Sequence, residues 1–106
     1  MRKLKNIHPG DVLLEEFLEP MGLSQNALGR AMGVAPRRVN EIILNKRGVS
    51  ADTSIRLARV LGTTPEFWLN LQASYDLEEA LKKLKTILPK LKDLTQTSDA
   101  HFVMAG

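Results

Sequence analysis

The sequence predicts an all-α fold, in which five helices form one domain and a helical extension follows them. Apolar residues recur at spacings of three and four, and no stretch alternates with the period of two that a half-buried strand requires. Proline, glycine and serine divide the chain at short intervals. With 106 residues, 43% of them hydrophobic, the chain can bury a single core, so a multi-domain enzyme is excluded on size.

The first helix is expected at about residues 10–19, with Pro9 near its first turn. Pro20 has no backbone N–H to donate and Gly22 suits a helix end, so we expect this pair to terminate the helix. Four apolar residues follow helical spacing, namely Leu14, Phe17, Leu18 and Met21.

The second and third helices are expected at about residues 25–32 and 36–44. Ser24 can cap the second helix, and Gly33 ends it. Pro36 suits the first position of the third helix, because the N–H that it lacks would be unpaired there. The inward stripes are Leu28, Ala31 and Met32 in the second helix and Val39, Ile42 and Ile43 in the third.

The fourth helix is expected between Ser50, its cap, and Gly62, and the fifth begins at Thr64-Pro65-Glu66. In the fourth helix we expect Ile55, Ala58 and Leu61 to face inward. For the domain as a whole, the predicted core contains Leu28, Val39, Ile42, Ala58 and Trp68.

The chain changes character after Tyr75, where leucines recur at spacings of four and three between lysines and glutamates. This pattern is typical of a helix that packs against a partner. Asp76 and Glu79 can start a separate helix as a capping box, or the fifth helix can continue through them, and Pro89 interrupts the series. The leucines are Leu77, Leu81, Leu84, Leu88 and Leu91.

Three segments follow from these patterns. Residues 1–75 form the domain, residues 76–94 form the leucine-rich helical extension, and residues 95–106 lack apolar periodicity and are expected to be a mobile tail.

The positive charge of the chain is concentrated in one quarter of it. The formal net charge is +3, yet residues 24–49 carry five Lys/Arg against Glu41 alone, a net charge of +4. The remaining segments are balanced or slightly acidic. Concentrated basicity of this kind is an electrostatic footprint for phosphate.

The same quarter has the pattern of a helix-turn-helix, at about residues 24–44. Gly29 is small where two crossing helices approach most closely, and Gly33 tolerates the positive φ of the sharp turn. Apolar residues occupy the positions that such a pair must bury, which are Leu28, Met32, Val34, Val39 and Ile42.

The face opposite this apolar stripe is predicted to contact double-stranded DNA. Arginine suits guanine and asparagine suits adenine in the major groove, so Arg37, Arg38 and Asn40 are the candidate base readers, with at least one of the two arginines on phosphate instead. Candidate backbone contacts come from the helix start and the following loop, at Ser24, Gln25, Lys46 and Arg47. Their alternative role is a plain cap and a solvated loop.

Two further residues have an indirect role in this prediction. Pro36 opens the recognition helix. Glu41 repels phosphate, so it either accepts a hydrogen bond from cytosine or tethers Arg37 or Arg38.

Residues 9–73 resemble the HigA-type antitoxins of the phage-repressor (Cro/C1, or XRE) helix-turn-helix superfamily. The resemblance rests on the runs PGDVL (9–13), LSQ (23–25), RRVNEI (37–42), KRG (46–48), ADT (51–53) and TPEFWLNLQ (64–72). It implies a lambda repressor-like domain in a dimeric repressor that binds its own operon and neutralises a small, basic, mRNA-cleaving toxin. The family's usual Asn-Gly pair is replaced here by Leu44-Asn45, and the resemblance does not cover the extension after Leu77.

One helix-turn-helix reads too few base pairs to find an operator, so we expect a homodimer on an inverted repeat. Its surface must lie outside residues 24–49, which are committed to DNA. The candidate dimer or partner residues are Phe67, Trp68, Leu71 and Tyr75 on the fifth helix, and Leu77, Leu81 and Leu84 beyond it.

Other function classes have less support. The chain has no cysteine, its two histidines (His8 and His101) lie at opposite ends, and no glycine-rich phosphate loop is present, so we expect no catalysis, metal or cofactor. No apolar run approaches a membrane span and the start lacks a secretory signal, which predicts a cytoplasmic protein. The remaining alternatives are a phage-type or housekeeping repressor without a toxin, and a helical adaptor.

Overall fold

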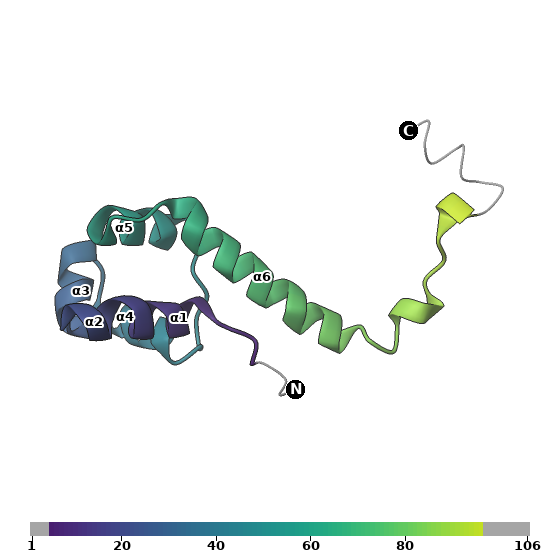
Figure 1. Cartoon of the computed structure of the whole chain (residues 1–106), viewed down its shortest axis with the longest axis horizontal. Helices are drawn as coiled ribbons and strands as arrows, with labels where there is room; N and C mark the ends of the chain where they lie inside the picture. The colour runs from purple at the N-terminus through teal and green to yellow at the C-terminus, as the bar shows by residue number, and fades with distance from the viewer. Residues whose placement is uncertain (1–4, 97–106) are drawn as a thin grey trace.

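The computed structural model describes residues 5–96, and every regular element in that range is a helix. Figure 1 shows short helices gathered into a body from which the long α6 projects. The elements are α1 (Pro9–Val12), η1 (Leu13–Leu18), α2 (Glu19–Met21), α3 (Gln25–Met32), α4 (Pro36–Ile43), α5 (Ala51–Leu61), α6 (Pro65–Lys83), η2 (Leu88–Lys90) and η3 (Leu94–Gln96). The predicted all-α class is confirmed.

The elements α1, η1 and α2 form one continuous helix, of which η1 is a π-helical stretch. Of the pair expected to end this helix, Gly22 does so, because its φ of 60° supplies the left-handed cap, whereas Pro20 lies within the helix. Within η1, Leu13 and Leu18 are buried, five residues apart, as the wider turn of a π-helix favours. Met21, expected on the inner face, is exposed.

The helix-turn-helix is formed by α3 and α4, which pack closely together. A Cβ atom on Gly29 would lie 3.1 Å from the Cα of Pro36, so only glycine fits without displacing the neighbour. Gly33 ends α3 with a φ of 72°, and the amide of Val34 donates to the carbonyl of Gly29. Both predicted glycine roles are confirmed, whereas Ala31 is exposed rather than inward-facing.

The start of α5 is capped by Ser50, whose side chain accepts from the amide of Thr53, and Thr64 caps α6 in the same way. The expected inward face of α5 is partly wrong. Ala58 is buried, but Ile55 is 58% exposed, and Leu57 is buried with the polar residues Thr53 and Ser54. Apolar spacing did not locate this face because two of its members are polar.

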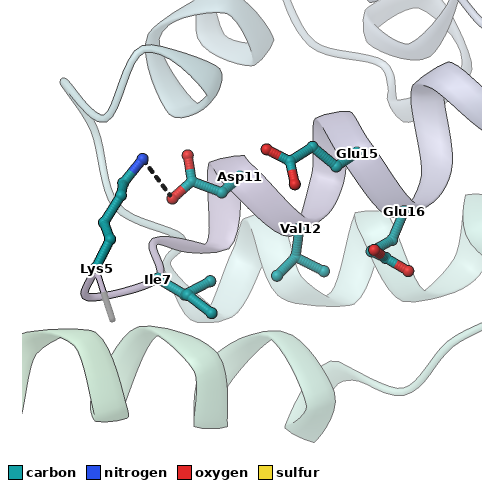
Figure 2. A pocket seen from close by; sticks show the side chains of 6 residues that line it. All are labelled: Lys5, Ile7, Asp11, Val12, Glu15 and Glu16. Carbon is teal, nitrogen blue, oxygen red and sulfur yellow. Dashed lines mark ion pairs between the residues drawn. The ribbon is translucent and has the colours of Figure 1, made fainter. Parts of the chain in front are cut away.

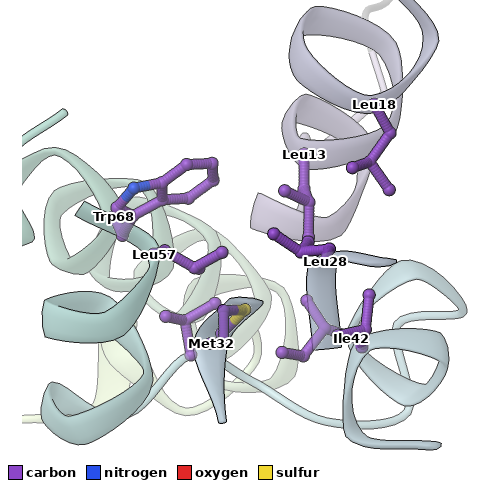
Figure 3. Packing of buried hydrophobic residues seen from close by; sticks show 9 residues of the cluster. Leu13, Leu18, Leu28, Met32, Ile42, Leu57 and Trp68 are labelled. Atoms are coloured by element: carbon purple, nitrogen blue, oxygen red, sulfur yellow. The ribbon is translucent and has the colours of Figure 1, made fainter. Parts of the chain in front are cut away.

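The hydrophobic core joins every helix of the body, and Figure 3 shows its side chains converging between them. All five predicted core residues are buried. The cluster consists of Leu13, Leu18, Leu28, Met32, Val39, Ile42, Val49, Leu57 and Trp68.

The helix α6 continues from the body past Tyr75 to Lys83 without a break, so the second of the two alternatives for this region is found. It ends before Pro89, whose ring would clash with a helical carbonyl one turn earlier. The five leucines of the extension are between 39% and 63% exposed and do not pack back on the body. The predicted tail from residue 95 lies outside the described residues, except for its first two positions.

The predicted partner surface on the fifth helix requires one correction. Trp68 has no exposed area, because it fills the core and its indole N–H donates to Thr63 Oγ1 at 2.7 Å. It therefore cannot contribute to a surface between copies. Phe67 is exposed, and Leu71 and Tyr75 are half-buried, with the ring of Tyr75 packed edge-on against His8.

Candidate nucleic-acid interface

The orientation of α4 is fixed by its apolar side. Val39 and Ile42 are buried between the helices of the body, and Pro36 at the first position sets the start of the helix. Because a helix turns by about 100° per residue, the opposite side must point outward. The side chain of Arg37 is 86% exposed there, and Asn40 is exposed beside it.

Polar side chains from α3, α4, α5 and the loop after α4 meet on this outward side, which we call the basic face. It consists of Gln25, Arg37, Arg38, Asn40, Glu41, Arg47, Asp52 and Arg56.

Glu41 lies between two arginines of the basic face. Arg37 Nε donates to its Oε2 at 3.1 Å, and Arg47 Nε donates to its Oε1 at 2.9 Å. The hydrogen bond from Arg47 is the largest effect and lowers the pKa of Glu41. Desolvation opposes it, and the hydrogen bond from Arg37 adds a smaller lowering, so the pKa is lowered on balance. Glu41 therefore tethers Arg37, as one alternative predicted, but its second partner is Arg47 and not Arg38.

Arg38 is joined to a different carboxylate. Its Nη1 lies 3.7 Å from Asp52 Oδ1, and the same oxygen accepts from Arg56 Nε at 2.7 Å. Arg56 also donates through Nη1 to the carbonyl of Met32 at 2.8 Å, which anchors it to the end of α3. A hollow lined by Arg38, Arg47, Ser50, Asp52 and Arg56 lies between these groups.

The remaining predicted residues also lie on or beside this face. Asn40 Nδ2 donates to Gln25 Oε1 at 3.0 Å, which joins the recognition helix to the start of α3. Ser24 Oγ accepts from the amide of Ala27, so its capping role is present. Lys46 is exposed in the loop.

The departure at Leu44-Asn45 is accommodated as expected. Asn45 adopts a φ of 61°, and the amide of Lys46 donates to the carbonyl of Glu41 at 2.8 Å, so the left-handed helix end is kept. Leu44 is 52% exposed at this end.

Asp52 and Arg56 were not among the predicted site residues. Their spacing of four within one helix is a visible signal for an ion pair. Their approach to Arg38 depends on how α5 packs beside α4, and no local pattern indicates that.

Other kinds of site lack support in the described part of the chain. Residues 5–96 contain no group of three or more acidic or histidine side chains placed to hold a metal ion. No helix in this range is long and apolar enough to cross a membrane.

Comparisons with known proteins agree with this geometry. A family model described as Helix-turn-helix matches residues 14–68. Antitoxin HigA-1 of Vibrio cholerae serotype O1 is 41% identical over 106 residues, covering 92% of this chain and 100% of the relative.

Two solved structures have the same fold. Pseudomonas aeruginosa antitoxin HigA with the higBA promoter is 39% identical, with a TM-score of 0.80, covering 84% of this chain and 97% of that one. Antitoxin GraA in complex with its operator is 46% identical, with a TM-score of 0.78, covering 88% and 95%. The family is one of DNA-binding regulators and not of enzymes. The chain belongs to the Cro/C1-type helix-turn-helix family and, within it, to the HigA-type antitoxins.

Proposed function

We propose that this protein is a sequence-specific DNA-binding repressor that acts as the antitoxin of a HigBA-type module. The observation that carries the proposal is the basic face, where a helix locked by Val39 and Ile42 presents Arg37 and Asn40 to solvent. These side chains match guanine and adenine edges in the major groove.

The residues have separate roles in this proposal. Arg37, Arg38 and Asn40 lie in the major groove, where they contact bases, except that at least one of the two arginines contacts phosphate instead. The flanking DNA backbone is contacted by Ser24, Gln25, Lys46 and Arg47. Relatives support the DNA part directly, since one is described with a promoter and another with its operator.

A dimer on an inverted repeat follows from the size of the face. Two copies would place their α4 helices about 34–36 Å apart, one helical turn of DNA. The projecting α6 exposes Leu77 and Leu81, and Leu84 at its C-cap is exposed as well, so this end of the helix offers an apolar surface for the second copy.

The antitoxin part requires a second protein, a small basic toxin that cleaves mRNA. A hollow beside α1 and η1 is lined by Asp11, Glu15 and Glu16 together with Ile7 and Val12 (Figure 2). Lys5 pairs with Asp11 at 3.7 Å, which leaves the two glutamates at the rim to complement a basic partner. The protein works in the cytoplasm by binding and not by catalysis.

The test uses the DNA upstream of the protein's own coding sequence and the product of the neighbouring reading frame. The full chain should bind the upstream duplex in preference to a shuffled duplex of equal composition and should co-purify with the neighbouring product. If the chain prefers the upstream duplex but does not co-purify with the neighbouring product, the protein is a repressor without a toxin partner. Equal binding to both duplexes would contradict the proposal.

A further inference from the structure

The basic face contains two carboxylates, although carboxylates repel phosphate. Glu41 contacts Arg37 and Arg47, and Asp52 contacts Arg38 and Arg56. A surface that only neutralised phosphates would bind DNA more tightly without these acids. Their regular placement, one acid between each two arginines, therefore calls for a different role.

We propose that Glu41 and Asp52 are positioning residues that give the arginines of the basic face two different roles in DNA binding. Glu41 directs Arg37 to a guanine, and Asp52 holds Arg38 beside the DNA backbone. This inference rests on the proposed function, because it concerns how the operator is distinguished from other DNA.

The geometry at Glu41 suits a base reader. The carboxylate uses Nε of Arg37, so both terminal nitrogens of this guanidinium are left for guanine O6 and N7. The side chain is otherwise 86% exposed and would sample many rotamers without the tether. The same carboxylate holds Arg47 from the loop, which links base reading to the backbone contact.

The geometry at Asp52 suits a backbone contact. Arg56 is fixed by Asp52 and by the Met32 carbonyl, so it acts as a support and not as a free cation. Arg38 is held more loosely, at 3.7 Å, and its side chain is only 35% exposed. It lines the hollow with Ser50 and Arg47, where it can exchange its carboxylate for a phosphate oxygen.

The two acids also reduce binding to DNA of the wrong sequence. Without a guanine in place, Arg37 and Arg47 stay paired with Glu41 and release fewer counterions from DNA. Removal of this carboxylate should therefore strengthen general binding and weaken discrimination at once, which loss of folding cannot imitate.

The experiment compares wild type with Glu41→Gln, Asp52→Asn and the control Glu66→Gln. The control removes the same charge from the exposed first turn of α6, which contributes no residue to the basic face. Affinities for the upstream duplex and the shuffled duplex are measured by fluorescence anisotropy from about 50 to 200 mM salt, a range in which phosphate contacts dominate.

For Glu41→Gln we expect the ratio of upstream to shuffled affinity to fall about tenfold, the discrimination that one bidentate base contact supplies. Its affinity for the shuffled duplex should rise and its salt slope should steepen by about one. Asp52→Asn should raise both affinities and change their ratio less than Glu41→Gln does. The control should change neither ratio nor slope.

A double-variant cycle shows whether Glu41 acts through Arg37. Arg37→Lys keeps the charge and loses the guanidinium fork, so adding Glu41→Gln to it should lower the ratio no further. An unchanged ratio in Glu41→Gln, an equal loss of affinity for both duplexes, or additive effects in the cycle would each overturn the inference. Failure of wild type to prefer the upstream duplex would instead contradict the proposed function.

Discussion

The helix-turn-helix and the C-terminal extension have similar apolar spacing and opposite environments. Leu28, Val39 and Ile42 are at most 1% exposed, whereas Leu77, Leu84 and Leu91 are 39% to 63% exposed. Both patterns predicted helices, and helices form in both places, although the second ends at Lys83. The comparison teaches that apolar periodicity indicates a helix with an apolar face. Whether that face is buried depends on which other elements of the fold pack against it.

Trp68 and Leu77 give the largest contrast, since they lie on the same helix. Trp68→Ala should lower the free energy of unfolding by about 3–5 kcal/mol, because it leaves a cavity in the core. Leu77→Ala, at a position 63% exposed, should change it by less than about 0.5 kcal/mol. Urea unfolding of both variants measures this, and similar losses would show that the extension is folded onto the body.

The exposed leucines should matter for association instead. Replacing Leu77 and Leu81 by serine should weaken the dimer by about 2–4 kcal/mol, the cost of losing two apolar side chains from a buried interface. The unfolding of each protomer should stay nearly unchanged. Analytical ultracentrifugation over a concentration series tests this, and a monomeric wild type would contradict the dimer.

Substitutions on or beside the basic face should distinguish residues that recognise bases from residues that contact the DNA backbone, without affecting the stability of the core. Arg37→Ala should relax sequence preference by about 1–3 kcal/mol, whereas Lys46→Ala should weaken binding to every duplex alike. Both side chains are exposed, so thermal unfolding serves as the control. Equal effects of the two variants on preference would remove Arg37 from the base readers.

The smallest expected effect concerns His8, where the start of α1 meets α6. Burial lowers the pKa of His8, against weaker opposing effects of Asp11 and Asp76. Its Nδ1 accepts from the amide of Gly10 at 2.9 Å, which requires the unprotonated ring. The unfolded chain therefore binds a proton more readily, so stability should fall as the pH drops below about 6.5.

Urea unfolding between about pH 7.5 and 5.5 measures this effect, because ordinary carboxylates stay charged in that range. His8→Asn retains a capping side chain and has no titrating ring, so its stability should change less over the same range. Parallel curves for the two proteins would show that His8 has no part in the pH dependence.

The sequence predicted more about the turn than about the first helix. The roles of Gly29 and Gly33 could be predicted from their spacing, because each position excludes other residues. The helices approach closely at Gly29, and the backbone has a positive φ at Gly33. The inner face of the first helix was only partly predicted. Leu18 is buried as expected, but the π-helical stretch shifts full burial to Leu13, while Leu14 is half-buried and Met21 is exposed. A period of 3.6 cannot reveal that shift.

The candidate site also has features that the sequence predicts and features that depend on tertiary packing. The basic quarter and the outward position of Arg37 follow from composition and helical spacing. The partnership of Glu41 with Arg47, and of Asp52 with Arg38, depends on how the loop and α5 fold against α4.

By itself, the sequence determined the helices, their caps and the concentration of positive charge, because these depend on neighbours within a few residues. The sequence analysis placed Trp68 both in the core and on the partner surface, and only the tertiary structure decided for the core. It also decided that Ile55 faces solvent and which carboxylate holds which arginine. Those outcomes depend on contacts between residues distant in the chain, where burial and charge pairing are set by packing and not by local propensity.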